Sequence, residues 1–421
     1  MTDPSSLLSV PRKREPELNE RGHWKPTTVK LLFVAIIAII VIVPIGFNLQ
    51  KLPLSFSWSQ KQIAYPVAPE IAMAIDQKGT IHLAYGGTSG LTYANNSGGS
   101  WTAEILGGYL RFCGIAVDSA GAAHVAAVLA TSTGRELVYV SNEFGHWESS
   151  VIDADVWGYP ISIAVDSERN AHISYSKNEL MYATNRGGSW NTTPLVEYGS
   201  GGWSSDIAVD SSDHVHIVAE CGSVIYFTNA DGEWKMEPIF YRDLTLFSVS
   251  IALDASNNPH VSYFGGNSLE GQWGLQYAVR IDGNWSSSCV EKLRPYSYPS
   301  CSIAVDRNGG VHITYVKLES SEFRYFRIAN GVNKTTILDR FSGGGITSCS
   351  VGVGEDDHVR IFHVTGSSSL NYFTNQPPPM IFHMLVDAAF VKALLCAPFV
   401  LGYVSWWRSM KRGNESDADY S

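Results

Sequence analysis

The sequence lacks the short motifs that mark many enzyme families. It contains no phosphate-binding P-loop, no dinucleotide-binding glycine fingerprint, no G-x-S-x-G turn and no H-E-x-x-H helix. It also lacks an excess of positive charge, because 30 lysines and arginines face 40 aspartates and glutamates, a formal charge of -10. A protein that binds a phosphate backbone needs the opposite balance, so nucleic acid is not an expected partner. We expect no cofactor and no metal.

What the sequence does contain is a repeated phrase, in which a short apolar run ends in Asp and a His follows six positions later. The clearest copy, at residues 161–175, reads ISIAVDSERNAHISY. The pairs are Asp76/His82, Asp118/His124, Asp166/His172, Asp210/His216, Asp254/His260 and Asp306/His312, and a seventh copy has Gly354 and Arg360. Successive copies are 42 to 52 residues apart, which is typical of one propeller blade of four strands.

Each repeat supplies the strands of a blade. The run before the Asp predicts an inner strand, the polar segment after it a turn, and the His the start of a second strand. A third strand carries an apolar-x-Tyr pattern in all seven copies, with Tyr at positions 93, 139, 182, 226, 277, 325 and 372. The pattern predicts an all-β fold, a seven-bladed β-propeller of four-stranded blades.

A polar turn with Gly and then Trp follows several of these tyrosines. Residues 96–101 read NSGGSW and residues 185–190 read NRGGSW. These turns resemble the Asp-box hairpin of sialidases and related propellers, whose pattern is D-x-G-x-x-W, with Asn here in place of Asp. The resemblance implies a hairpin between the third and fourth strands.

The seventh repeat ends after its third strand, at residues 370–375, and three prolines at 377–379 forbid a fourth ladder strand. Residues 56–63, ahead of the first repeat, have the Trp and the following apolar position of a fourth strand. We therefore expect this N-terminal strand to complete the last blade and to close a ring that spans residues 54–376.

Two apolar runs flank the predicted ring. Residues 29–48 follow a polar, basic tail (1–28), which we expect to be disordered and cytoplasmic, and are long enough to cross a bilayer as an uncleaved anchor. A cleaved signal peptide is the alternative. Residues 380–407 form a second predicted span before the basic start of the tail 408–421. Both termini are then cytoplasmic and the ring lies outside the cell membrane, which makes Asn95, Asn191, Asn284 and Asn333 candidate glycan acceptors.

Six cysteines are compatible with either redox state. Cys113, Cys301 and Cys349 each stand five residues before the repeated position, at the start of an inner strand, which predicts buried thiols. Cys289 and Cys301 bracket one connection between blades and could form a disulfide, which the sequence does not decide.

The repeated Asp and His invite a metal or acid/base reading, but a single active site does not need six copies, so a structural role is preferred. A ligand is more readily recognised by loops that differ between blades. There, aromatic side chains with flanking Arg and Glu suit a sugar or a protein partner, whereas the alternative is that the aromatics fill gaps between blades. The candidate binding residues are Trp157, Tyr159, Trp203, Arg242, Glu270, Trp273, Arg294, Tyr298 and Arg340.

The preferred interpretation is a membrane-anchored, extracytoplasmic binding module for a glycan or an envelope protein. A surface glycosidase or polysaccharide lyase is one alternative, and a structural subunit of a membrane complex is another. The resemblance to sialidases implies, for an enzyme, an arginine cluster, a Tyr paired with a Glu and an acidic acid/base residue. Residues 326–328 read FRI and match that family's FRIP signature only in part, so no catalytic residue is assigned.

Overall fold

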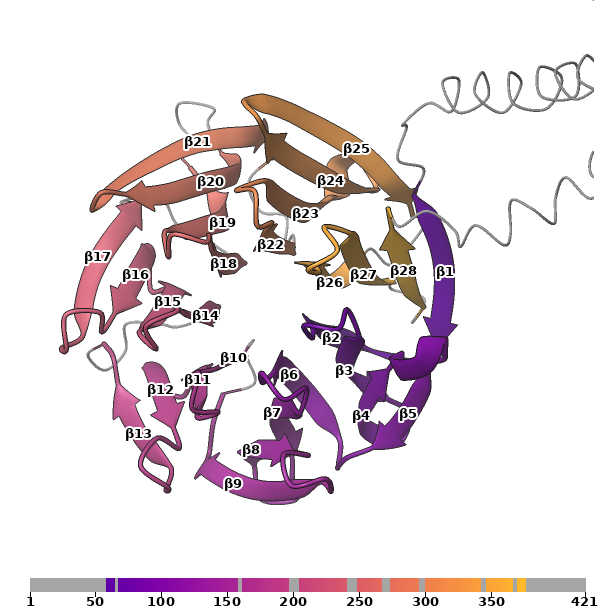
Figure 1. Cartoon of the computed structure of the whole chain (residues 1–421), viewed down its shortest axis with the longest axis vertical. Helices are drawn as coiled ribbons and strands as arrows, with labels where there is room; N and C mark the ends of the chain where they lie inside the picture. Colours follow the sequence, from indigo (N-terminus) through magenta and orange to yellow (C-terminus); the bar gives the residue numbers. More distant parts are fainter. Residues whose placement is uncertain are drawn as a thin grey trace, which may run out of the picture. The chain divides into compact units, whose positions relative to one another are not determined.

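The computed structural model describes residues 58–64, 67–157, 161–196, 204–240, 248–266, 273–294, 300–341, 346–365 and 369–375. These residues form seven four-stranded antiparallel sheets that follow one another around a central axis, an all-β seven-bladed propeller (Figure 1). Helical structure within this part of the chain is limited to two 3-10 turns, η1 (Ser97–Gly99) and η2 (Leu318–Ser320). No helix among the described residues is long and apolar enough to cross a bilayer, and the predicted spans and tails lie outside them.

In the first six blades the strands run from the inside to the outside in chain order, and blade 7 takes its outermost strand from the N-terminal side of the ring. Blade 1 contains β2 (Val67–Ile75), β3 (Ile81–Gly87), β4 (Gly90–Asn95) and β5 (Thr102–Ile105), and blade 2 contains β6 (Leu110–Val117), β7 (Ala123–Ala130), β8 (Arg135–Ser141) and β9 (Glu148–Ala154). Blade 3 contains β10 (Ser162–Val165), β11 (Ala171–Ser176), β12 (Leu180–Thr184) and β13 (Asn191–Pro194), and blade 4 contains β14 (Ser205–Val209), β15 (Val215–Glu220), β16 (Val224–Thr228) and β17 (Lys235–Phe240). Blade 5 contains β18 (Val249–Leu253), β19 (Pro259–Gly265), β20 (Gly274–Ile281) and β21 (Asn284–Lys292), and blade 6 contains β22 (Cys301–Val305), β23 (Val311–Lys317), β24 (Glu322–Ala329) and β25 (Val332–Arg340). Blade 7 contains β26 (Ile346–Val353), β27 (Val359–Thr365), β28 (Leu370–Thr374) and β1 (Ser59–Ala64).

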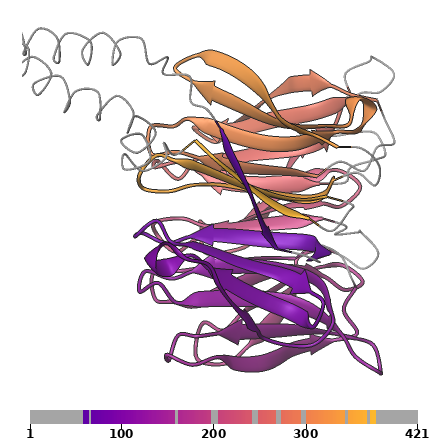
Figure 2. The same cartoon turned by 90° about the vertical axis from the view of Figure 1, so that its right-hand side faces the viewer.

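This up-and-down order gives the ring two different ends, seen from the side in Figure 2. The turns between first and second strands and the hairpins between third and fourth strands lie at one end, which we call the turn end. The connections between second and third strands and those from blade to blade lie at the other, which we call the loop end. All the gaps in the described part of the ring fall in loop-end connections.

The core lies between the blades rather than within any one of them. The second strands β11 and β15 are buried along their whole lengths, whereas the outer strand β5 is exposed throughout. One cluster joins Val218 and Tyr226 of blade 4 to Val249, Ile251 and Val261 of blade 5. Because each blade buries both faces against its neighbours, no blade has a complete core alone.

The predicted closure of the ring by the N-terminal strand is confirmed. Strand β1 pairs antiparallel with β28, with Ser59 opposite Thr374 and Lys61 opposite Tyr372. Trp58, just before β1, packs edge-on against Tyr325 of blade 6, with ring centroids 4.9 Å apart. The first described strand therefore takes the outer place of the last blade and covers an edge that would otherwise be unpaired.

Deleting residues 56–65 removes this strand. Backbone hydrogen bonds contribute about 1 kcal/mol each, so we expect the free energy of unfolding of the ring to fall by about 3 kcal/mol or more, with a lower midpoint in thermal unfolding. A deletion of ten residues within 1–28, outside the ring, is the matched control. An unchanged midpoint in the strand deletion would show that the ring does not depend on this closure.

Candidate functional site

Each of the first six blades has the same triad of residues at the turn end, the repeated Asp, its His and the third-strand Tyr, with Asp-to-His distances from 3.0 Å in blade 6 to 3.7 Å in blade 1. In blade 3, Asp166 Oδ1 accepts the backbone N–H groups of Glu168 at 3.0 Å and Asn170 at 2.7 Å, which closes the turn between β10 and β11. Asp166 Oδ2 lies 3.1 Å from His172 Nε2, and His172 Nδ1 lies 2.6 Å from Tyr182 Oη. The His-to-Tyr distance is between 2.5 and 2.7 Å in all six blades. The expected structural role of the repeated Asp and His is confirmed.

The protonation states follow from burial. Burial lowers the pKa of His172 below its ordinary value of 6.5, against the opposing effect of Asp166, and the other five triad histidines shift in the same direction. Burial raises the pKa of Asp166, but hydrogen bonds from Asn170 and His172 outweigh it, so the net shift is downward. A neutral imidazole has one donor and one acceptor nitrogen, which is what a bridge between a carboxylate and a phenol requires.

In blade 7 the Asp and His of this triad are replaced by Gly354 and Arg360, and Asp356 pairs with the arginine. Arg360 stands where the His would be, is buried, and donates to Asp356 at 2.9 and 2.7 Å. A Cβ atom at Gly354 would lie 2.4 Å from Arg360 Nη1, so an Asp at that position would require the guanidinium to move. The degenerate seventh copy is thus a different solution to the same turn.

The Asp-box-like hairpins also have a structural role. The hairpin Asn accepts the N–H of the residue that opens the second strand, as from Ile81 to Asn96 Oδ1 at 2.7 Å, and three other blades repeat this bond. In blade 7, Asn375 after β28 accepts the N–H of Val359 in the same way. The Trp after the turn packs edge-on against the third-strand Tyr of the preceding blade, as in Tyr139 with Trp190 at 5.0 Å. The Asn thus fixes the hairpin within its own blade, and the Trp joins that blade to the preceding one.

The structure places four of the nine predicted binding residues. Trp157 is half-buried, and its backbone N–H donates to the carbonyl oxygen of Ser176 at 3.0 Å. Trp273 is 2% exposed and stacks on Phe264 at a centroid distance of 6.4 Å, so its indole is a core side chain. Arg294 is exposed and its backbone N–H donates to the Glu319 carboxylate. Arg340 is the last residue of β25 and is exposed, and five of the nine lie outside the described residues: Tyr159, Trp203, Arg242, Glu270 and Tyr298.

The four candidate glycan acceptors all lie beside hairpins of the turn end. Asn191, Asn284 and Asn333 open or lie near the start of outer strands and are exposed, whereas Asn95 ends β4 and is half-buried.

The structure also describes the cysteines of the inner strands: Cys113, Cys301 and Cys349 are buried as predicted. Cys289 is exposed and free, and Cys301 is free, so the open possibility of a disulfide between them is not realised.

At the loop end, Arg340 belongs to a network of charges between blades 5 and 6, formed by Glu291, Lys317, Glu322, Arg324 and Arg340. Arg324 donates to Glu291 at 2.7 and 2.8 Å and to Glu322 at 2.5 and 2.8 Å. Lys317 Nζ lies 2.5 Å from Glu291 Oε1, and Arg340 Nη2 lies 2.9 Å from Glu322 Oε1. The Arg340 side chain is 69% exposed while Glu322 is 8% exposed, so a buried acid orients an exposed cation. We refer to these five residues as the loop-end charge network.

The electrostatics of the network are those of satisfied ion pairs. The Arg324 guanidinium holds the pKa of Glu322 below its ordinary range. Burial raises the pKa of Glu291, but Lys317, Tyr315 and Arg324 outweigh it and the net shift is downward. Sequence reasoning identified Arg340 alone, although Glu322 and Arg324 alternate along β24 and so share a face.

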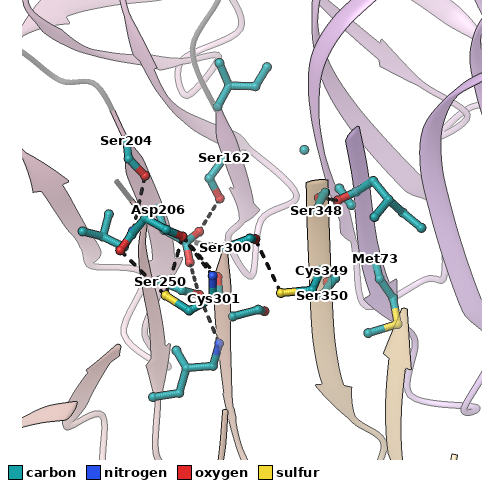
Figure 3. Close-up of a pocket in the computed structure, with 18 of the residues that line it drawn as sticks. Met73, Ser162, Ser204, Asp206, Ser250, Ser300, Cys301, Ser348, Cys349 and Ser350 are labelled. Carbon is teal, nitrogen blue, oxygen red and sulfur yellow. Dashed lines mark hydrogen bonds between the residues drawn. The ribbon is translucent and has the colours of Figure 1, made fainter. Parts of the chain in front are cut away.

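The inner strands enclose a cavity of about 430 Å³ on the axis (Figure 3). Its lining is mostly aliphatic in blades 1 and 2 and rich in Ser in blades 4 to 7, and it contains one carboxylate, Asp206 of β14. Oδ1 of Asp206 accepts from Ser162 Oγ at 2.6 Å and Ile207 N at 2.9 Å, and Oδ2 accepts from Ser250 Oγ and Ile251 N, both at 2.9 Å. Burial raises the pKa of Asp206, against these hydrogen bonds. Neither the composition nor the repeat predicted this residue.

The serines explain why Asp206 is accommodated. In the next blades, Ser250 Oγ accepts Ile303 N at 3.3 Å and Ser302 Oγ accepts Val351 N at 3.2 Å, so each side chain satisfies an amide at the inner edge of its neighbour. Asp206 does the same for Ile251 and also accepts the hydroxyl hydrogens of serines on both sides.

Among the described residues no group of three or more His, Cys, Asp and Glu could hold a metal ion.

Replacing Asp206 tests this account. Asp206→Ala leaves the Ile251 amide and two hydroxyls without their acceptor, so we expect the free energy of unfolding to fall by about 3 kcal/mol. Asp206→Ser introduces the residue that other blades use here, so we expect a loss of less than about 1 kcal/mol. Denaturant unfolding of both variants provides the measurement, and equal losses would contradict the role of this amide acceptor.

A second prediction concerns how the stability of the ring changes as the pH falls. The triad histidines bind protons more readily in the unfolded chain, so their contribution to stability is complete above pH 6.5 and is lost as pH falls towards their lowered pKa values. Glu220, at the loop end of β15, acts in the opposite sense because burial raises its pKa from 4.5 to about 7, and its contribution is lost as pH rises through that value.

We therefore expect the midpoint of thermal unfolding to be lower at pH 5.5 than at pH 7.5. The decrease should be larger in Glu220→Gln, where the opposing titration is absent. Thermal unfolding at both pH values measures this. Equal drops in the two proteins would mean that Glu220 does not titrate in this range, and a rise on acidification would contradict buried neutral histidines.

Comparison with known proteins supports the fold and goes no further. No family model and no curated protein matches the chain. Among solved structures, a catalytically inactive variant of virginiamycin B lyase from Staphylococcus aureus, with quinupristin, is 11% identical with a TM-score of 0.52 over 76% of this chain and 99% of that one. A PL25 ulvan lyase bound to a GlcA(1-4)Rha3S unit is 11% identical with a TM-score of 0.53 over 77% and 99% of the two chains. The GH74 xyloglucanase from Xanthomonas campestris is 12% identical with a TM-score of 0.51, over 74% of this chain and 53% of that one. At such identities the likeness extends to the propeller fold alone.

Proposed function

We propose that this protein is a membrane-anchored, extracytoplasmic propeller whose loop end binds a glycan. The observation that carries the proposal is the outward-facing Arg340, which Glu322 orients at 2.9 Å while Arg324 in turn holds Glu322. A cation fixed in this way loses little side-chain freedom when it binds an acidic or hydroxylated ligand. With three cations and two carboxylates, the loop-end charge network also carries one positive charge in excess.

An exposed aromatic plane at the same end supports the proposal. Tyr109, in the connection between blades 1 and 2, is 68% exposed, and the Arg111 guanidinium carbon lies 5.6 Å from the centre of its ring. Aromatic rings stack on the apolar faces of sugars, and arginines bind their carboxylate, sulfate or hydroxyl groups. The chain therefore offers both components of sugar recognition at the loop end.

A glycosidase or lyase on this scaffold is the second candidate, and one contact favours it. Tyr315 donates to Glu291 beside Arg324, which matches the Tyr, Glu and Arg that the resemblance to sialidases implies. Tyr315 is fully buried, however, and burial together with Glu291 raises its pKa. The same contact recurs between blades 2 and 3, where Tyr175 and Lys177 each lie 2.7 Å from the Asp153 carboxylate. This recurrence favours a tie between blades over a catalytic role.

The partial FRIP match does not add to the enzyme case. Arg327 Nη2 lies 4.0 Å from Asp306 Oδ2 at the turn end, at the opposite end of β24 from Arg324. If no sugar binds, the alternatives are that the protein binds a protein partner in the cell envelope or is a structural subunit of a membrane complex.

The test is glycan-array binding by the full chain in detergent, with bound sugars examined for cleavage. We expect binding without cleavage, and Arg340→Ala should weaken it about tenfold, or about 1.4 kcal/mol, because an oriented charge is removed. Lys334→Ala is the matched control, since it removes an exposed cation from the turn end of the same strand. Cleavage would favour the enzyme, and no binding would favour a protein partner.

A further inference from the structure

The chain enters and leaves the ring at the same place. Ser59 at the start of β1 is opposite Thr374 at the end of β28, and Ser59 Oγ lies 3.4 Å from Thr374 O. In every other blade this position is occupied by the hairpin between third and fourth strands. Both connections to the flanking segments therefore start at the turn end, on blade 7.

The connection after the ring is short. Four residues, Gln and three prolines at 376–379, separate Asn375 from the apolar segment 380–407. Proline-rich chain extends by about 3.1 Å per residue, so these four residues reach about 12 Å. If the apolar segment spans a bilayer, as the proposed function requires, the turn end of blade 7 stays close to the membrane surface.

The surface of the turn end suits such a position. Phe144, Ile281 and Val332 are large apolar side chains at hairpins of the turn end, exposed by 67%, 53% and 65%. Many of the charges around these hairpins and turns are paired, with Arg169 3.3 Å from Glu143, Lys235 2.6 Å from Asp231 and Arg307 3.3 Å from Asp357. Apolar tips among neutralised charges can enter a headgroup layer without requiring anionic lipid.

We propose that the turn end of the ring rests on the lipid headgroup layer, with Phe144, Ile281 and Val332 as its contacts. The loop end, with Tyr109 and Arg340, then faces away from the membrane. This inference rests on the membrane anchoring in the proposed function and adds the orientation and the partner surface. Contact is favoured by the tether, because a surface held within a few tens of ångströms meets the lipid at high effective concentration.

The inference has a consequence for the candidate glycan acceptors. Asn284 and Asn333 lie three residues from Ile281 and one residue from Val332, respectively. A bulky oligosaccharide there would hold the hairpins away from the lipid. Lipid contact and glycosylation are therefore mutually exclusive at these two positions.

The test measures the height of each end of the ring above a membrane. The full chain is reconstituted into phosphatidylcholine vesicles containing an acceptor-labelled lipid, and a donor dye is attached through p-azidophenylalanine at position 109 or, in a second protein, at position 146, where the native His146 is 66% exposed in the same hairpin as Phe144. Strands of about seven residues at about 3.3 Å per residue separate the two ends by about 23 Å. We expect energy transfer to place position 146 nearer to the lipid than position 109 by about that distance.

A triple variant tests the contacts themselves. Phe144→Asp with Ile281→Asp and Val332→Asp should reduce the difference in height while leaving the unfolding midpoint unchanged, because all three side chains are exposed. The matched control is Ile105→Asp with Val151→Asp and Met236→Asp, which alters equally exposed residues of outer strands β5, β9 and β17.

Equal heights, a loop end nearer to the lipid, or a glycan on Asn284 or Asn333 of protein from glycosylating cells would overturn the inference. Chain that fails to float with the vesicles would overturn the anchoring in the proposed function as well. Loss of sugar binding with the expected heights would overturn only the proposed ligand.

Discussion

The close approach of the inner strands near the axis is the constraint on which the rest of the ring depends. A Cβ atom at Gly114 would lie 3.2 Å from Ile163 N, and one at Gly352 would lie 2.9 Å from Ile75 Cδ1, so small side chains are required there. The same strands have one edge without a ladder partner, and buried amides need acceptors. Serine meets both requirements, being small and able to accept the N–H of the neighbouring blade, as Ser250 does for Ile303. The hydroxyl-rich cavity is thus primarily a consequence of how seven sheets converge.

Features that recur could be predicted from the sequence because a repeated side chain has a repeated structural task. The Asp and His of six copies and the third-strand Tyr are predicted in this way, the closing strand is predicted from the fourth strand that the seventh copy lacks, and the structure confirms their places. Asp206 was not recognised, since its role depends on Ser162 and Ser250, each 44 residues away in a neighbouring blade. The loop-end charge network was missed for the same reason, because Glu291 and Arg324 meet only when blades 5 and 6 pack together. The sequence also does not show which loop side chains are exposed. Trp273 is a core residue although its position in the sequence suggests a loop.

The departures from the repeat divide between the two ends of the ring. At the turn end, the Gly354, Asp356 and Arg360 set keeps the geometry of a turn with different chemistry, so it preserves structure. At the loop end, Glu220 is a buried acid in a position where other blades have residues such as Ser176 or Phe264, and Arg340 is an oriented exposed cation. A uniform scaffold with non-uniform loops is how repeat folds usually acquire a specific ligand.

The pairing of β1 with β28 also determines when the fold can be completed. Ser59 and Thr374 are 315 residues apart, so the strand that is synthesised first finds its partner only after the last blade has been made. Until then the nascent chain has an open seventh blade and a free strand edge, which is the kind of surface that pairs with other chains. Contacts of such long sequence separation form slowly, because a large loop must close before they form. Completion of the ring during biosynthesis is therefore a single late event that depends on both ends of the propeller.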